Sequence, residues 1–564
     1  MPSVLAELKR RKVYQAAAFY AAAAWLLVQI ATQVLPFFEL PNGWVRLIVV
    51  VAIAGFPIAI TLAWFYEWTP AGFRRESEAE RTESISRIVG EALDRKVFTP
   101  RKFATLSPQA NDQSIAVLPF VDMSEKKDHE YFSDGLAEEL LNLLAQLPQL
   151  RVIARTSSFS FKGKDVDIAT IATALNVASI LEGSVRRAGN TLRVTAQLIR
   201  TTDSSHLWSQ TYERELADVF AVQDDIAHAV VAALKVKLLP EQHVPNVLRT
   251  ESTEAYDLYL LGQDFFRRGR YDDCLRALPV FQRALELDPQ YAPAYAGLAG
   301  AQSAAADFAL SPARRASGKH EALASAEKAI SLAPDLADGY VMRGQIRYRH
   351  IWDWKGAEAD YQRALTLDPN RSDALTGYAL AQANLGRSEE ALALARRATD
   401  ADPLSWLAWT FYGLVLHNIG RIAEARAAFV HALEISPNAT FTRLGLGLLD
   451  LHDGDAKSAL EHFRCAGEGY AQAGIAMAEH TLGHARESQA ALDELKAKYV
   501  AGFSFQIAQV HAWRGEKDDA LEWLERAYEQ HDPGILRLRS DPQLWLLQDD
   551  PRYVALIQNL NYPD

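Results

Sequence analysis

Cysteine is almost absent from this chain of 564 residues, which holds only Cys274 and Cys465. There is no CxxC pair and no Cys/His spacing typical of zinc ligands, so the sequence argues against a disulfide framework and a structural zinc site. Each cysteine stands alone within an expected helix, where a small buried thiol is the simplest interpretation. The sequence predicts no metal site.

Signatures of nucleotide binding and hydrolysis are missing as well. No GxxxxGK[ST], HExxH, GxSxG or GxGxxG pattern occurs. Two pairs of adjacent carboxylates, Glu138-Glu139 and Asp224-Asp225, could serve acid–base or metal chemistry. Both pairs are expected near helix starts, where the helix dipole favours negative charge, so we interpret them as structural. The sequence thus predicts no catalytic residue and no cofactor, and it indicates that the chain is not an enzyme.

Positive charge is in deficit, with 59 Lys and Arg against 71 Asp and Glu and a formal net charge of −12. A protein that binds nucleic acid nonspecifically has a basic surface, and the excess of acidic residues in this chain does not indicate such a surface. We therefore expect no nucleic-acid partner.

Charged residues are missing altogether from two runs near the start, residues 13–38 and 47–66. Each run is long enough to cross a bilayer as a helix. The sequence therefore predicts a two-helix transmembrane hairpin over residues 1–70, with spans at about 13–36 and 47–66 and the lipid bilayer as a partner. A buried hairpin of a soluble protein is the alternative.

Basic residues flank this predicted hairpin on both sides, at 9–12 before it and at Arg74, Arg75 and Arg81 after it. The positive-inside rule then places both termini and the soluble domains in the cytoplasm, at a bacterial inner membrane. Residues 71–112 read as a linker.

Residues 113–240 combine strand and helix patterns and predict a small α/β domain. An apolar strand at 114–120, a helix capped by Ser133 and a strand at 150–155 make a βαβ unit plausible. The later elements are a helix at 168–175, a hairpin of strands 179–187 and 191–200 turned at Gly189-Asn190, a strand at 206–212 and a helix at 218–238.

Six phrases of this segment carry a resemblance. In order they are Val-Leu-Pro-Phe (117–120), Tyr-Phe-Ser-Asp-Gly-Leu-Ala-Glu-Glu-Leu (131–140), Leu-Glu-Gly-Ser-Val-Arg (181–186), Ala-Gln-Leu-Ile (196–199), His-Leu-Trp (206–208) and Phe-Ala-Val-Gln-Asp-Asp-Ile-Ala (220–227). Together they resemble the TolB-like amino-terminal domain of bacterial signalling proteins with TPR repeats. In such families the domain often follows a nucleotide cyclase or a winged-helix domain. The 40-odd residues between the predicted membrane hairpin and this domain cannot hold a cyclase.

Prolines mark a repeat in the second half, because Pro369, Pro403 and Pro437 follow one another at intervals of 34 residues. This is the period of the tetratricopeptide (TPR) repeat, a helix–turn–helix unit. Residues 406–437 fit its pattern through Trp409, Gly413, Ala425, Phe429, Ala432 and Pro437. We expect seven or eight units in an all-α TPR solenoid over residues 253–540, closed by a C-terminal cap at 541–564.

A stacked TPR array offers a concave groove lined mainly by first helices. Asn384 and Asn418 lie one repeat apart and could hold an extended peptide backbone, while Leu380 and Leu414 occupy another groove-type position. An ordinary polar helix surface is the alternative for the asparagines. No clustered Lys/Asn set appears, which departs from the carboxylate clamp of chaperone-binding TPR proteins.

Three functions follow from these features. The first is a membrane-anchored scaffold that recruits a protein or peptide partner in the cytoplasm, for signalling or assembly. The alternative is a sensor, in which the α/β domain binds a small molecule and regulates the TPR groove. The third is an accessory part of a nucleotide-cyclase-like regulator.

Overall fold

The computed structural model describes residues 66–69, 72–75, 113–124, 130–147, 149–234, 249–268, 271–307, 312–467, 469–500 and 502–563. The chain divides into two compact units, residues 1–107 and 108–564. In the first unit, strands β1 (Tyr66–Thr69) and β2 (Gly72–Arg75) form an antiparallel pair.

The predicted membrane hairpin requires a correction. Within the described residues, no helix combines the length and the apolar character needed to cross a membrane. The predicted spans at about 13–36 and 47–66 lie outside these residues, except for Tyr66, which begins strand β1. The fold class is therefore a small α/β domain with a large helical TPR solenoid. A bilayer partner and an inner-membrane location are not supported.

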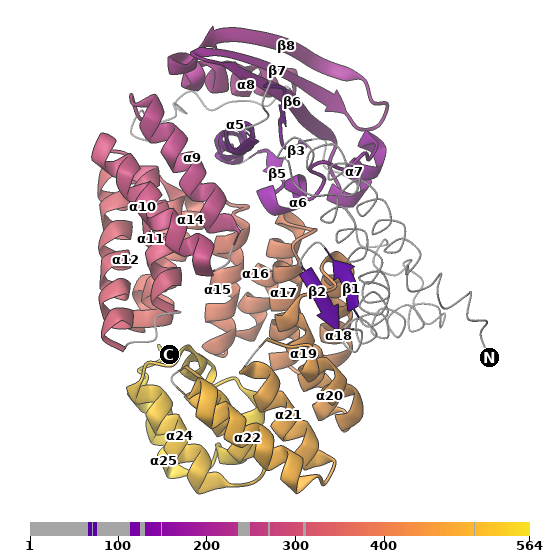
Figure 1. Ribbon diagram of the computed structural model, residues 1–564, viewed down its shortest axis with the longest axis vertical. Coiled ribbons are helices and arrows are strands. Elements are labelled where there is room, and N and C mark those ends of the chain that lie inside the picture. Colours follow the sequence, from indigo (N-terminus) through magenta and orange to yellow (C-terminus); the bar gives the residue numbers. More distant parts are fainter. Residues whose placement is uncertain are drawn as a thin grey trace, which may run out of the picture. The chain divides into compact units, whose positions relative to one another are not determined.

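The second unit begins with a sheet of six strands (Figure 1). Its elements are β3 (Ser114–Val117), β4 (Val121–Asp122), α5 (Glu130–Ala145), β5 (Arg151–Val152), α6 (Arg155–Phe159), α7 (Ile168–Leu175), β6 (Ser179–Ala188), β7 (Thr191–Arg200), β8 (His206–Glu215) and α8 (Val219–Ala233). The strand order is β5-β3-β6-β7-β8, with β4 beside β6. β3 is parallel to β5 and β6, whereas β6, β7 and β8 are antiparallel.

The sequence predicted most of these elements correctly, including the βαβ unit, helix α7 and the β6–β7 hairpin. One cap was wrong. Helix α5 begins at Glu130, so Ser133 lies buried inside its first turn and does not precede it. The apolar run after Ser133 is a real helical face, but the helix extends further towards its N-terminus than the run itself indicates.

Burial alternates along β7, as its sequence predicted. Leu192, Val194 and Leu198 are fully buried, whereas Arg193 is exposed. The buried side chains pack with those of α5 and α8 in one hydrophobic core. This period-two pattern fixes which face of the sheet the two long helices cover.

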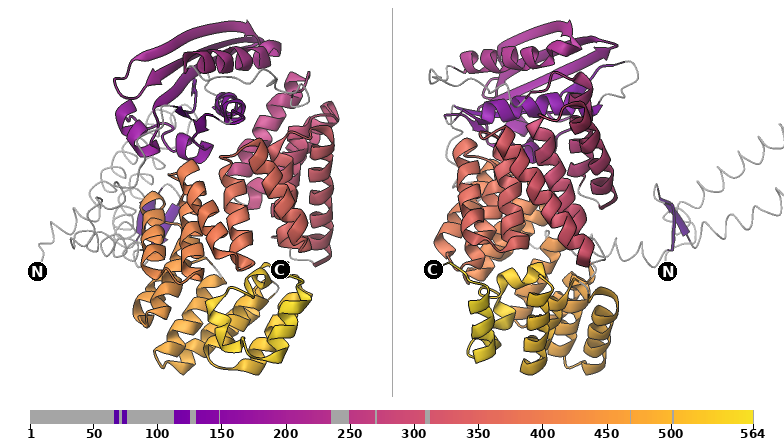
Figure 2. Two further views of the ribbon diagram at one scale, coloured as in Figure 1. Left: turned by 180° about the vertical axis from the view of Figure 1, so that it is seen from behind. Right: turned by 90° about the vertical axis from the view of Figure 1, so that its left-hand side faces the viewer.

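Helices α9 to α24 follow, and within the described residues they pair into eight antiparallel hairpins (Figures 1 and 2). Their bounds are α9 (Thr253–Arg267), α10 (Tyr271–Leu287), α11 (Ala292–Asp307), α12 (Pro312–Leu332), α13 (Ala337–Ile346), α14 (Trp354–Leu367), α15 (Ser372–Asn384), α16 (Ser388–Ala401), α17 (Trp406–Asn418), α18 (Ile422–Ile435), α19 (Thr440–His452), α20 (Ala456–Arg464), α21 (Tyr470–Thr481), α22 (Ala485–Tyr499), α23 (Ser504–Trp513) and α24 (Lys517–Glu529). Two short 3-10 helices, η6 (Pro533–Arg537) and η7 (Pro542–Leu547), and helix α25 (Pro551–Asn559) complete the chain.

A buried aromatic ring held between two glycines recurs in the hairpins. Phe429 of α18 is fully buried, and a Cβ added at Gly413 or at Gly445 would lie 2.6 Å from its ring. Phe281 packs in the same way against Gly262 and Gly297, and Phe463 against Gly447 and Gly474. The glycines let first helices of successive repeats approach the same ring, which explains their place in the repeat pattern.

The α/β domain docks on the repeats at two places. Its core continues without a break into the first hairpin, where Phe132 of α5 packs edge-on against Tyr256 of α9. The second contact lies at the turn between α16 and α17. There the Ser157 backbone N–H and hydroxyl both donate to the Asp402 carboxylate, and the Ala154 N–H donates to the Ala401 carbonyl at 2.9 Å. These two contacts fix the domain across several repeats.

Candidate functional site

The four predicted groove residues lie on first helices of adjacent hairpins, Leu380 and Asn384 on α15 and Leu414 and Asn418 on α17. Asn384 is 2 % exposed; its amide donates to the Tyr348 hydroxyl and its oxygen accepts from Ser540 Oγ at 3.2 Å. The other three side chains are half-buried. Their role in peptide binding stays a prediction, and for Asn384 it requires the amide to exchange a buried internal hydrogen bond for a ligand.

The chain's own C-terminal segment, residues 532–562, contacts first helices of three hairpins. Ser540 meets Asn384 of α15, Gln543 Nε2 lies 3.2 Å from His452 Nε2 of α19, and Gln509 of α23 donates to Asp541 at 2.9 Å. Leu536 joins the hydrophobic core around α14 and α15. This segment therefore covers part of the face that these first helices present.

An open pocket lies where the α/β domain meets the repeats. The α/β domain contributes α5 through Glu139 and α8 through Gln223, and the repeats contribute α9 through Tyr259. The hairpin turns around α13 and α15 add Asp338, Asp368 and Arg371. The walls thus come from segments more than 200 residues apart.

The charged residues of this pocket differ in their surroundings: Arg371 forms ion pairs, whereas the pKa values of two carboxyl groups are raised. Arg371 Nη2 lies 2.8 Å from Asp338 Oδ1, and its Nε lies 2.8 Å from Asp373 Oδ1. Burial and the nearby carboxylates of Glu138 and Asp338 together raise the pKa of Glu139 to about 8, although two nearby arginines oppose the shift. Burial also raises the pKa of Asp368 to about 6, although the charge of Arg371 opposes the shift.

The neighbouring Glu138 has a different environment. Arg155 Nε lies 2.9 Å from one oxygen of its carboxylate, and Arg267 of α9 donates to the other. Glu138 therefore ties the α/β domain to the first repeat. The sequence interpretation of this pair was wrong in one respect, since both residues lie in the middle of α5 and not at its start.

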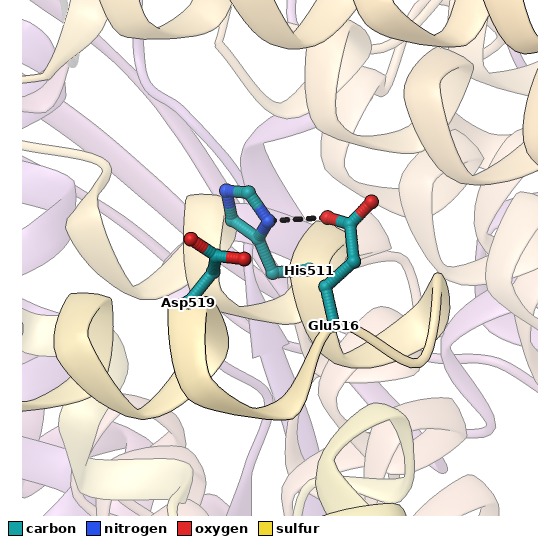
Figure 3. Close-up of side chains that lie close together, drawn as sticks. All are labelled: His511, Glu516 and Asp519. Atoms are coloured by element: carbon teal, nitrogen blue, oxygen red, sulfur yellow. Dashed lines mark hydrogen bonds and ion pairs between the residues drawn. The ribbon is translucent and has the colours of Figure 1, made fainter.

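A second cluster, His511, Glu516 and Asp519, brings together three possible metal ligands (Figure 3). His511 Nδ1 lies 2.5 Å from Glu516 Oε2, across the turn between α23 and α24. The same turn in the preceding hairpin holds Glu479 and His484 with the two residue types exchanged, at 2.7 Å. In both turns a backbone hydrogen bond of 2.9 Å joins the same two residues. We interpret the cluster as a repeated turn contact that stabilises each hairpin.

Sequence reasoning did not find the pocket. The sequence marks Glu139 only as half of a carboxylate pair, and it gives no signal that Gln223, Asp338 or Arg371 lines a pocket. An acidic residue on a helix with many apolar positions was the available signal. Its partners could not be named because they lie on the distant repeats.

Comparison with known protein families supports the helical array. A tetratricopeptide repeat model matches residues 353–405 and 379–440. The chain therefore contains TPR repeats, arranged as an all-helical solenoid. Residues 111–229 match the model described as "HilA/YgeH-like transcriptional regulator, second domain", which covers the α/β domain.

Two curated relatives share parts of the chain. A protein of Rhizobium meliloti (strain 1021) described as "Putative adenylate cyclase 3" is 42% identical over 186 residues, which are 33% of this chain and 32% of that protein. The Hsp70-Hsp90 organising protein of Plasmodium falciparum is 32% identical over 117 residues, 21% of this chain and 40% of that protein. The chain thus spans about a third of the length of the first relative and two fifths of the second.

Solved structures of similar proteins have low overall scores. The Cut9-Hcn1 hetero-tetramer of the APC/C has a TM-score of 0.38 at 15% identity, covering 60% of this chain and 59% of that chain. A thermophilic TPR protein of Thermus thermophilus has a TM-score of 0.30 at 22% identity, covering 35% of this chain and 99% of that chain.

Proposed function

We propose that this chain is a non-enzymatic scaffold whose TPR solenoid recruits a protein or peptide partner in signalling or assembly. The match of residues 353–440 to TPR repeats carries the proposal, since such arrays present extended surfaces for protein ligands. The Hsp70-Hsp90 organising protein matches only part of the chain, so the proposal names no chaperone as partner.

We assign the α/β domain the bounds 113–240 and propose that it connects the scaffold to signalling. Its match to a domain of transcriptional regulators and the name of the rhizobial relative both support a place in signalling. The sequence contains no GxxxxGK[ST], HExxH, GxSxG or GxGxxG motif, so we do not extend the cyclase name to this chain.

Affinity capture with the full-length chain tests the scaffold function. Wild-type protein and an Asn418→Arg variant are compared, because Asn418 is half-buried on first helix α17 and an arginine there would obstruct a ligand in the groove. Glu434→Arg on second helix α18 is the matched control, with an exposed side chain. We expect one protein to be retained by wild type and control and lost from Asn418→Arg. Equal recovery on all three would contradict recruitment through the groove.

A second function, ligand sensing, is favoured by the pocket between the α/β domain and the repeats. A molecule bound there would touch both parts and bias their contact, which is the requirement for coupling a ligand to the repeats. A thermal-shift screen of the full-length chain with metabolites tests it. Stabilisation by a particular compound supports sensing, and no stabilisation by any of them counts against it.

A further inference from the structure

We infer that the pocket between α5, α8 and the repeats binds an organic cation, namely an amine or a guanidinium group. The inference deepens the sensing function proposed above by naming the class of ligand. It rests on three features of the pocket: hydrogen-bond acceptors that lack a donor, arginines that are already paired, and aromatic walls.

Two hydrogen-bond acceptors that line the pocket receive no hydrogen bond from the described residues. No described residue donates a hydrogen bond to the Glu139 carboxylate or forms an ion pair with it. Gln223 is 3 % exposed, and its amide nitrogen donates to the Tyr256 hydroxyl, whereas its side-chain oxygen has no hydrogen-bond partner in the described parts of the chain. Glu139 is half-buried and lines the pocket together with Gln223. Acceptors on a pocket wall that have no donor from the protein can accept from a ligand, so this pair suits a ligand that donates.

The arginines that line the pocket form their ion pairs with carboxylates other than Glu139. Arg371 is engaged by Asp338 and Asp373, and Arg249 forms an ion pair with Asp224. The Asp368 carboxylate accepts a backbone N–H from Asn370 at 3.2 Å, which leaves its charge in place. When ionised, Glu139 and Asp368 therefore add negative charge that a cationic ligand would compensate.

Aromatic rings favour an organic cation over a metal ion. Phe220 and Tyr259 both line the pocket, and the Arg249 guanidinium already lies 5.8 Å from the centre of the Phe220 ring. Ring faces attract amines and guanidinium groups, whereas Mg²⁺ and Ca²⁺ require a dense shell of oxygen ligands. The ligand is either a free small molecule or a basic side chain of a protein partner.

Binding should depend on pH, because Glu139 attracts a cation only when it is ionised. Its pKa of about 8 reflects burial and the charges that face it, namely Glu138, Asp338, Arg267 and Arg371. Asp368 faces Arg371, Asp373 and Asp338 and ionises at a lower pH, with a pKa of about 6. Affinity for a cation should therefore rise as the pH increases through about 8.

Calorimetric titration of the full-length chain at a pH of about 8.5, above the pKa of Glu139, tests the inference with three probes. Butylguanidinium represents a free cation, butylurea is its uncharged counterpart of similar shape, and the peptide acetyl-Gly-Arg-Gly-amide represents a protein side chain. Glu139→Gln removes the charge with little change of volume. Glu525→Gln is the matched control, on the exposed surface of α24.

We expect butylguanidinium or the arginine peptide to bind wild type and control, with roughly a tenfold loss or more in Glu139→Gln and roughly a fivefold loss or more in wild type at a pH of about 6.5. Butylguanidinium binding identifies a free ligand, and binding of the peptide alone identifies a partner's side chain. Equal binding of butylurea, equal affinity in Glu139→Gln, or binding of Mg²⁺ in place of both cations would overturn the inference. So would the absence of cation binding up to a pH of about 9. Ligand sensing itself would survive that result if another compound stabilised the chain.

Discussion

Two adjacent glutamates on α5 show how strongly the surroundings decide what a residue does. Glu138 contacts Arg155 and Arg267 and holds the α/β domain to the first repeat. Glu139, one residue further, faces the pocket with a pKa raised to about 8. One helical step of about 100° separates a structural ion pair from a candidate ligand contact.

Glu139→Gln should change how the stability of the ligand-free chain depends on pH. The folded-state pKa of Glu139 lies above its unfolded value, so the folded chain binds the proton more tightly and loses stability as the pH rises from about 4.5 to about 8. The variant lacks this loss and should gain about 1 to 2 kcal/mol relative to wild type between a pH of about 5 and one of about 8.5. Denaturant unfolding at both pH values measures the difference. A relative stability that is the same at both pH values would show that Glu139 ionises normally.

At the scale of the hairpin, the ring between two glycines is the unit that stacks one repeat on the next. Phe429 contacts Gly413 of its own repeat and Gly445 of the following one. The sequence pattern supplied Gly413 and Phe429 but not the second glycine, which belongs to the next repeat.

Gly445→Ala should destabilise the solenoid by about 1 to 3 kcal/mol, because the new Cβ would lie 2.6 Å from the Phe429 ring and force the two helices apart. Gly467→Ala is the control, since the nearest atom to its added Cβ is Thr440 Oγ1 at 3.8 Å. The shift of the urea midpoint measures both. A Gly445→Ala chain as stable as Gly467→Ala would contradict the close packing.

The hairpins and their type could be predicted from the sequence because the 34-residue period and the apolar faces are local signals. The β6–β7 hairpin followed from Gly189-Asn190 and the alternation along each strand. The surroundings of Asn384 could not be predicted, because Ser540 reaches it from 156 residues away. The pocket could not be predicted from the sequence for the same reason, since Glu139 and Arg371 become neighbours only in the folded chain.

At the scale of the whole second unit, the contact between Ser157 and Asp402 is one of the two that hold the α/β domain on the repeats. Asp402 is 3 % exposed and accepts both the N–H and the hydroxyl of Ser157. The pocket depends on this arrangement, because its two sides belong to the two parts that the contact joins.

Asp402→Ala should leave the Ser157 donors unpaired and cost about 1 to 3 kcal/mol. Hydrogen exchange should accelerate at β5 and α6, whereas helices α9 and α10, on the other docking contact, should keep their protection. Glu389→Ala, an exposed residue of α16, is the control. Unchanged exchange at β5 and α6 would mean that the contact around Phe132 and Tyr256 suffices to hold the domain.

Recruitment of a protein partner by the solenoid is tested most directly by photo-crosslinking in cells. A benzophenone amino acid replaces Asn418 on first helix α17 and, in a second chain, Glu434 on second helix α18. We predict a covalent adduct with one protein from the Asn418 position and none from the Glu434 position. No adduct at the Asn418 position, or the same adducts at both positions, would contradict a scaffold that binds its partner in the groove.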